Sequence, residues 1–374
     1  MKATEHLAAN RMQEHIKTRK LILATAYAIS LLMATAGMVH AETINWRLTT
    51  FTPEGAADYR ECVEEFVKNV TLTTGGEIKI QAFGSGVLAR PFETPQAVQK
   101  GVADVGIYFP AYMVNDDPAN AFLAGLPGGM PADATMAWIY YGGGQKLWEE
   151  FRREAMGLHP VVACIGPTEI LAHSRKPLRT KEDFKGLKFR TTGAWAEILR
   201  DYLGASPVVL PAGDIFTALE RGVIDGTEYV TPTINLATGL HRIAKYIVVP
   251  GVHQPTYVYE FMIKKEVWDK LRPDLKDKII ASGKLTMMDG LARLSVSDMD
   301  AMGKMLAEGK NEMVTLDPSF INTVRKYSRD WATKKMEAQK TKGNTWMSRF
   351  AESYYAFQDR WIETSGIRFV NRKE

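Results

Sequence analysis

Arg190 is the residue of this chain whose position most clearly offers a ligand contact. It ends a predicted strand, Leu187–Arg190, and precedes Thr191-Thr192-Gly193, a turn that opens a predicted helix. A guanidinium group there can hold a carboxylate through two parallel hydrogen bonds, and the free N–H groups of the helix start reinforce the contact. The alternative is a solvated arginine on the rim of a sheet.

A second candidate lies in residues 210–232, which read as a helix, a turn and a strand. Asp214 is predicted to cap the helix, and Gly222 to end it in the left-handed conformation. The following strand, Glu228–Val230, then presents a carboxylate and the Tyr229 ring where open α/β folds bind ligands. The alternative is an ordinary connection with a surface glutamate.

The same succession of helix, turn and strand occurs about a hundred residues earlier. Residues 95–106 run through a helix and a turn into a strand predicted over Val105–Phe109. Two copies of one step predict two similar lobes, with a cleft that suits a small ligand. Tyr108 and Tyr112 follow the first copy and can close over the ligand, or else pack beneath the rim.

Enzyme signatures are missing from the sequence. It contains no H-E-x-x-H, C-x-x-C, P-loop or G-x-S-x-G motif. The four histidines after residue 41 lack metal-ligand spacing; they are His159, His173, His241 and His253. The formal charge of +4 provides no basic footprint for nucleic acid.

The N-terminus predicts export. Lys17, Arg19 and Lys20 precede the apolar, small-residue-rich stretch 21–38, and Val39-His40-Ala41 resembles a signal-peptidase site. We therefore predict a signal peptide over residues 1–41 and a periplasmic protein, the alternative being an uncleaved membrane anchor. No cysteine follows the cleavage site, which argues against a lipoprotein, and translation can also start at Met12.

Only two cysteines are present, Cys62 and Cys164. An exported protein can pair them, but their positions on a predicted helix and in an apolar strand fit two buried thiols at least as well. The sequence leaves both alternatives open.

The chain opens as β-α-β, which predicts an α/β fold. Its first elements are a strand over Ile44–Phe51, a helix over 56–70 and a strand over Glu77–Phe83. Further strands are predicted at Val161–Ile165, Leu187–Arg190, Pro207–Leu210, Lys245–Val249 and Thr256–Ile263, with helices over 134–155, interrupted at residues 142–144, and over 194–202.

From about Lys265 the chain is mostly helical, with a helix start predicted at Asp317-Pro318. After Gly343 the last helix carries one aromatic stripe, made of Trp346, Phe350, Tyr354, Phe357 and Trp361. We predict that this stripe is buried against a second copy and forms a homodimer; packing on the chain's own lobes is the competing outcome.

Two segments carry a family resemblance. Residues 184–190 and 211–225, together with Glu228-Tyr229, resemble the solute-binding subunits of tripartite ATP-independent periplasmic (TRAP) transporters. The resemblance runs from about residue 44 to about 324. Residues 140–144, 147–148, 117–118 and 250–251 are similar to the branch that binds 2-oxo acids and hydroxy acids.

The resemblance implies a two-lobed periplasmic binding protein of type II-like α/β fold. Each lobe has a mixed sheet, with inter-lobe strands and a long helix that crosses both lobes. Lobe I is expected in residues 42–163 plus about 254–315, lobe II in 164–253, and C-terminal helices in 316–374. Such a receptor closes on its ligand and delivers it to membrane subunits driven by a sodium gradient.

The resemblance also assigns roles to single residues. Arg190 matches the family's carboxylate-binding arginine, and Glu228 with Tyr229 matches a Glu-Trp pair that holds a cation bridging the ligand. Glu169 falls near a glutamine of that branch, and His253 stands where the branch has an aromatic residue and a glutamate.

Three departures follow from this match: Tyr229 for tryptophan, Glu169 for glutamine, and Val252-His253-Gln254 for the aromatic and the glutamate. Two carboxylates, Glu169 and Glu228, repel in one site unless a cation lies between them. We therefore expect a bridging Na⁺ or Ca²⁺, with the Tyr229 carbonyl as a further ligand, and no catalytic cofactor.

These inferences predict a periplasmic receptor for a small 2-oxo or hydroxy acid rather than an enzyme. Two alternatives remain at this stage: an extracytoplasmic sensor with the same fold, and a secreted α/β hydrolase, which would need a nucleophile–base pair that no motif supplies.

Overall fold

The computed structural model describes residues 12–25, 43–210 and 212–365, and the chain divides into two units, 1–43 and 44–374. In the first unit, residues 12–25 form an exposed helix, while the predicted cleavage site at 39–41 lies outside the described residues. Among the described helices, none combines the length and hydropathy that a membrane span requires.

The first sheet has five strands in the order β2-β1-β3-β10-β4. β1 pairs in parallel with β2 and β3, whereas β10 is antiparallel to both β3 and β4. The strands are β1 (Ile44–Thr50), β2 (Ile78–Phe83), β3 (Val105–Tyr108), β4 (Leu158–Gly166) and β10 (Tyr257–Lys264). β4 is buried along its whole length because helices cover this sheet, which explains its continuous apolar run.

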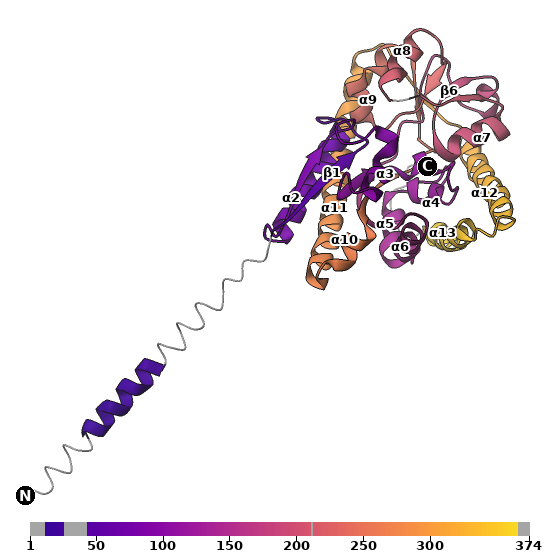
Figure 1. The fold of residues 1–374 in the computed structure, drawn as a ribbon. Helices are drawn as coiled ribbons and strands as arrows, with labels where there is room; N and C mark the ends of the chain where they lie inside the picture. Colours follow the sequence, from indigo (N-terminus) through magenta and orange to yellow (C-terminus); the bar gives the residue numbers. More distant parts are fainter. Residues whose placement is uncertain (1–11, 26–42, 211, 366–374) are drawn as a thin grey trace, which may run out of the picture. The chain divides into compact units, whose positions relative to one another are not determined.

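The second sheet has six strands in the order β11-β9-β5-β8-β6-β7 and is also mixed. Its strands are short: β5 (Ala172–Ser174), β6 (Lys188–Arg190), β7 (Ser206–Val208), β8 (Gly226–Thr227), β9 (Tyr246–Val249) and β11 (Glu312–Thr315). Two mixed sheets with surrounding helices confirm the predicted two-lobed α/β fold (Figure 1).

Helices cover both sheets. Around the first lie a π-helical turn η1 (Tyr59–Glu64), α2 (Glu65–Thr73), α3 (Thr94–Gln99), α4 (Asn120–Ala124), α5 (Ala132–Tyr141), α6 (Gly144–Met156) and α10 (Lys265–Lys270), with 3₁₀ turns η2 (Pro91–Glu93) and η3 (Pro110–Met113). The second carries α7 (Gly193–Leu203), α8 (Ile215–Glu220) and α9 (Pro232–Thr238), with 3₁₀ turns η4 (Lys181–Phe184), η5 (Ala212–Asp214) and η6 (Leu240–Arg242).

The long helix α11 (Pro273–Ala307) crosses between the lobes, as predicted. Near its start Leu275 packs in one core cluster with strands of the first sheet, and near its end Met305 packs against Ile247 of β9. The chain then returns to the second sheet as β11, which pairs with β9. The predicted lobe I segment, 254–315, is therefore too long by this strand.

Cys62 and Cys164 form a disulfide, which answers the question that the sequence left open. Cys62 lies on η1 and Cys164 on β4, and both are buried in one core cluster with their Cα atoms 5.4 Å apart. Of the two alternatives, the disulfide forms because η1 packs directly on β4, at a distance that suits the bond.

Removal of this disulfide is expected to destabilise the protein. The bond joins residues 102 positions apart, and the Cys62→Ser, Cys164→Ser double variant should lose about 2–4 kcal/mol of unfolding free energy. Denaturant titration of the oxidised wild type, the reduced wild type and the variant measures this loss. If all three unfold at the same denaturant concentration, the bond contributes nothing to stability.

A buried ion pair joins α6 to β10. Arg152 and Glu260 are 1 % and 0 % exposed, and the Arg152 Nε donates to both carboxylate oxygens at 3.0 and 2.9 Å. Trp148 Nε1 also donates to Glu260, and Arg152 Nη2 donates to the Asn120 side chain. Every charged group in this network therefore has a partner, as burial of charge requires.

The C-terminal helices α12 (Pro318–Lys340) and α13 (Trp346–Glu363) pack on this chain (Figure 1). The Asp317 side chain caps α12 by accepting from the Ser319 N–H, as predicted. On α13, Trp346, Phe350 and Tyr354 are 7 %, 0 % and 1 % exposed and contact Phe122, Trp138 and Phe151. The stripe predicted to face a second copy is thus largely core, because the break at Gly343 turns α13 back onto α5 and α6.

Two local predictions in residues 210–232 are also wrong. Asp214 precedes α8, but its side chain makes no capping hydrogen bond, and the strand is Gly226–Thr227 rather than Glu228–Val230. Glu228 therefore lies just beyond the strand end. Gly222 does adopt the left-handed conformation, with φ of 73°.

Candidate functional site

Arg190 and Glu228 lie together because their strands are neighbours. β6 and β8 are parallel, with Arg190 opposite Thr227, so Glu228 follows immediately at the same edge of the sheet. Arg190 Nη1 lies 3.3 Å from Glu228 Oε1, and Nε and Nη2 donate to the Leu210 carbonyl at 3.2 and 3.1 Å. Both charged side chains are more than nine-tenths buried.

The segment after Arg190 forms one wall of a cavity. Thr191 and Thr192 lead into α7, and residues 191–195 line the cavity. The first N–H groups of a helix have no intrahelical partner and favour anions. Arg190 and the start of α7 thus lie in the same wall of the cavity.

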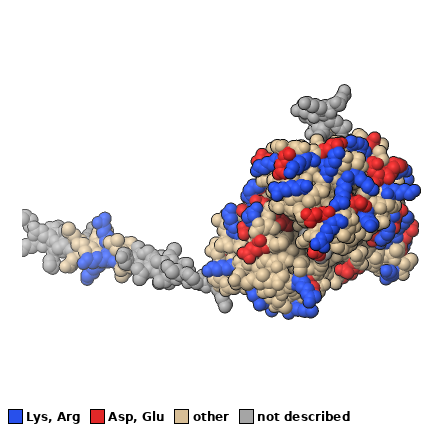
Figure 2. Space-filling model, turned by 90° about the horizontal axis from the view of Figure 1, so that it is seen from above, with Lys and Arg blue, Asp and Glu red and all other residues tan. Residues whose placement is uncertain are grey.

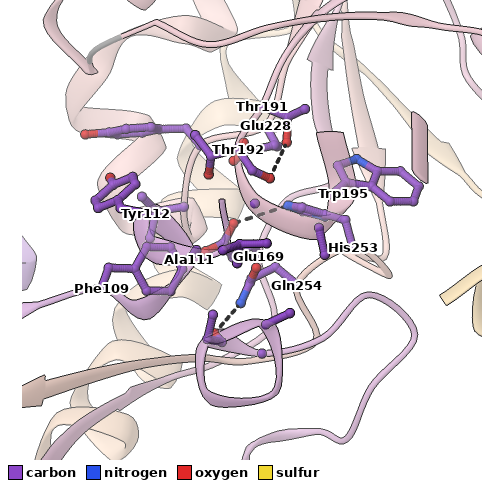
Figure 3. Close-up of a pocket in the computed structure, with 18 of the residues that line it drawn as sticks. Phe109, Ala111, Tyr112, Glu169, Thr191, Thr192, Trp195, Glu228, His253 and Gln254 are labelled. Atoms are coloured by element: carbon purple, nitrogen blue, oxygen red, sulfur yellow. Dashed lines mark hydrogen bonds and ion pairs between the residues drawn. The ribbon is translucent and has the colours of Figure 1, made fainter. Parts of the chain in front are cut away.

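Glu169 and His253 come from the two segments that connect the sheets. Glu169 follows β4, and its N–H donates to the Gln254 carbonyl at 3.2 Å, which places the two segments side by side. A Cβ atom at Gly251 would overlap the Glu169 carbonyl, so only glycine permits this approach. His253 Nε2 then lies 3.3 Å from Glu169 Oε2 (Figure 3).

Glu169, Glu228 and His253 form a cluster whose ligand atoms all lie within 4.8 Å of one another. Burial and then the charge of Glu228 hold the pKa of Glu169 well above its usual range, although Arg190 opposes this. Burial likewise raises the pKa of Glu228 against the opposing effect of Arg190. Burial lowers the pKa of His253 to about 3, which leaves a neutral imidazole.

The donor set of this cluster fits a cation. Neither ring nitrogen of His253 has a hydrogen-bond partner among the described residues, although the ring is only 3 % exposed. Two carboxylates with raised pKa values and one guanidinium leave the site short of positive charge. A cation there would supply that charge and bind ligand oxygens.

Residues from both sheets line the cavity, whose volume is about 60 Å³. Six of the seven predicted binding residues line it: Arg190, Glu169, Tyr112, Glu228, Tyr229 and His253. The Arg190 guanidinium lies 6.0 Å from the centre of the Tyr229 ring, and burial raises the pKa of Tyr229 to about 12. Tyr112 packs edge-on against Phe51 and Phe109.

Tyr108 is the exception among the predicted binding residues. Its hydroxyl donates to the Phe92 carbonyl at 3.3 Å, and the residue does not line the cavity. Alternation along the extended chain fits this: Tyr108 ends β3 in the core, whereas the next residue, Phe109, lines the cavity, and Tyr112 lies on η3. This prediction is therefore corrected to packing beneath the rim.

Three residues of the cavity wall were not among the predicted binding residues: Gln254, Trp195 and Asp58. Gln254 fixes the wall by donating from Nε2 to the Ala124 and Thr256 carbonyls, both at 2.7 Å. Trp195 lines the cavity from the first turn of α7, and Asp58 lines it from the start of η1. Asp58 follows the first strand by a short loop, which is the signal that could have identified it.

Two lobes that enclose a small charged cavity define a ligand-binding receptor. The profile of the bacterial extracellular solute-binding proteins, family 7, matches residues 49–339, and the chain belongs to this family. This confirms the resemblance to TRAP solute-binding subunits, a transport family and not a family of enzymes. It also agrees with the predicted periplasmic location.

The chain is similar to proteins from several bacteria. The chain is 27% identical over 329 residues to a monocarboxylate 2-oxoacid-binding periplasmic protein of Nostoc sp., covering 86% of this chain and 87% of that protein. A TRAP solute-binding protein from Bordetella bronchiseptica, crystallised as a dimer with calcium and picolinate, superposes with a TM-score of 0.80 at 25% identity and covers 87% and 95% of the two chains. One from Pseudoalteromonas atlantica, with sodium and pyruvate, has a TM-score of 0.79 at 24% identity and covers 87% and 97%.

Proposed function

We propose that this protein captures a small organic monocarboxylate in the cavity between its two sheets and delivers it to the membrane subunits of a TRAP transporter. The observation that carries this proposal is the buried guanidinium of Arg190, fixed at the cavity wall beside the start of α7. The binding named for the Nostoc relative, a monocarboxylate 2-oxoacid, supports the same ligand class.

The cavity limits the size of this ligand. Its volume of about 60 Å³ favours a short acid over a long one. Pyruvate and lactate, with three carbons, are the ligands that we propose. Calorimetric titration of three-carbon and six-carbon monocarboxylates tests the proposal, and preference for the longer acids would contradict it.

We further propose that Glu169, Glu228 and His253 hold a cation that bridges to the ligand, with the Tyr229 carbonyl as a fourth ligand. The calcium of the Bordetella relative supports this reading. The imidazole distinguishes this chain from an all-oxygen site, because nitrogen ligands suit zinc and similar ions better than Na⁺ or Ca²⁺.

Removal of the cation is expected to weaken ligand binding by at least about tenfold. Without it, the carboxylates of Glu169, Glu228 and the ligand would meet in one buried site. Ligand is titrated calorimetrically after exhaustive chelation in sodium-free buffer, and again after addition of Na⁺, Ca²⁺ or Zn²⁺. Addition of K⁺ is the control. Undiminished affinity in the chelated, sodium-free buffer would contradict the bridging cation.

We also propose a homodimer. Its surface would be smaller than the whole aromatic stripe of α13 that the sequence predicted. Phe357 and Trp361 of α13 are partly exposed and line a groove with Tyr141, which is 89 % exposed. Light scattering of the protein determines the oligomeric state.

A further inference from the structure

Asp58 places a third carboxylate in the wall of the cavity. The residue is 8 % exposed and lies at the start of η1, where Oδ1 accepts from the Tyr59 N–H at 3.1 Å. Capping carboxylates at a helix start are ordinarily solvated, whereas this one is buried and lines the ligand cavity.

Asp58 forms no ion pair within residues 43–210 and 212–365, and the neighbouring Arg60 instead donates to the Gly55 carbonyl. Tyr229 and Tyr259 share the cavity wall with Asp58, and burial and then the charge of Asp58 raise the pKa of both phenols. Asp58 therefore belongs to the wall of the cavity that the ligand would occupy. Burial raises the pKa of Asp58 itself to about 6, although the charge of Arg60 acts to lower it.

The charged residues that line the cavity leave Asp58 without a counter-charge. Among the described residues that line the cavity, Arg190 is the one guanidinium or ammonium group, against the carboxylates of Asp58, Glu169 and Glu228. The ligand carboxylate would neutralise the charge of Arg190, and the carboxylates of Glu169 and Glu228 would neutralise the charge of a bound cation. Asp58 is left over: among the described residues its side chain accepts from the Tyr59 N–H, and a buried carboxylate short of donors is costly.

We propose that the ligand supplies this donor: it carries a hydroxyl or ammonium group that Asp58 accepts, so that the receptor selects short hydroxy or amino acids over the matching 2-oxo acids. This inference rests on the proposed capture of a monocarboxylate by Arg190. Asp58 is then a specificity-determining residue, because a 2-oxo oxygen offers it no proton and repels its charge.

The experiment compares three acids of one skeleton. Pyruvate, lactate and alanine, the last two as both enantiomers, are titrated calorimetrically into the wild type, Asp58→Asn and Arg190→Ala, with the cation present. Asparagine retains the capping oxygen that accepts from Tyr59, so Asp58→Asn removes the charge while conserving the helix start. Thermal melting confirms that each variant folds.

Lactate or alanine is expected to bind the wild type about 10- to 100-fold more tightly than pyruvate. Comparison of lactate with alanine shows whether the site takes a hydroxyl or an ammonium donor. In Asp58→Asn this ratio should fall towards one, because the amide can also donate to a 2-oxo oxygen, and in Arg190→Ala all three affinities should fall together.

Three results would overturn the inference. If pyruvate binds at least as tightly as lactate and alanine, or if Asp58→Asn leaves the ratio unchanged, Asp58 only caps η1, and capture by Arg190 still stands. If none of the acids binds the folded wild type, the proposed function fails and the inference fails with it.

Discussion

Arg190→Ala should abolish ligand binding in a protein that still folds. Arg190 is the one guanidinium of the cavity wall among the described residues, and it is 4 % exposed. Loss of a buried, charge-assisted contact to a carboxylate should weaken binding by about 2–5 kcal/mol, or about thirty-fold to several thousand-fold. Calorimetry measures this loss.

Two further variants separate the lost contact from a folding defect. Arg190→Ala leaves the buried Glu228 without its partner, so the double variant Arg190→Ala, Glu228→Gln removes the uncompensated charge as well. Arg200→Ala, at an exposed position on α7, is the matched control and should bind like the wild type. Near wild-type affinity in folded Arg190→Ala would exclude Arg190 from the site.

Arg152→Ala should be the most destabilising of the substitutions considered for this chain. It leaves Glu260, which is fully buried, without a cation, and it removes the hydrogen bond to Asn120. Breaking such a pair should lower the unfolding free energy by about 3–5 kcal/mol. Urea denaturation followed by circular dichroism measures this change.

Arg293→Ala supplies the comparison for this pair. Arg293 contacts Glu61 at 2.6 Å, but it is 43 % exposed, so solvent screens the interaction and the expected loss is below about 1 kcal/mol. Equal losses in Arg152→Ala and Arg293→Ala would show that burial does not determine the strength of these pairs.

The elements that the sequence predicted well are those with a local signal. β1 and β10 were found because apolar and β-branched residues follow a strand pattern, and α12 because Asp317-Pro318 marks its start. β8 was misplaced because two paired residues carry almost no periodicity. Whether the aromatic stripe of α13 packs within the chain or against a second copy depends on the direction of the chain after Gly343. No local pattern determines that direction.

The site shows the same division between local and tertiary information. Arg190 ends β6 as the local pattern predicted, whereas Glu228, predicted within a strand, lies just beyond β8, and the pairing of β6 with β8 brings the two together. Glu169 and His253 came from the resemblance alone, since two irregular connections bring them together. The disulfide is a tertiary matter too: Cys62 and Cys164 lie 102 residues apart, and only the packing of η1 on β4 brings them into range.

The central claim is that this cavity binds a small carboxylate through Arg190. A crystal structure of the protein with lactate and Ca²⁺ tests it most directly. We expect the ligand carboxylate within hydrogen-bonding distance of the Arg190 guanidinium, enclosed between residues of both sheets. A ligand bound elsewhere, or bound in this cavity with its carboxylate away from Arg190, would contradict the account.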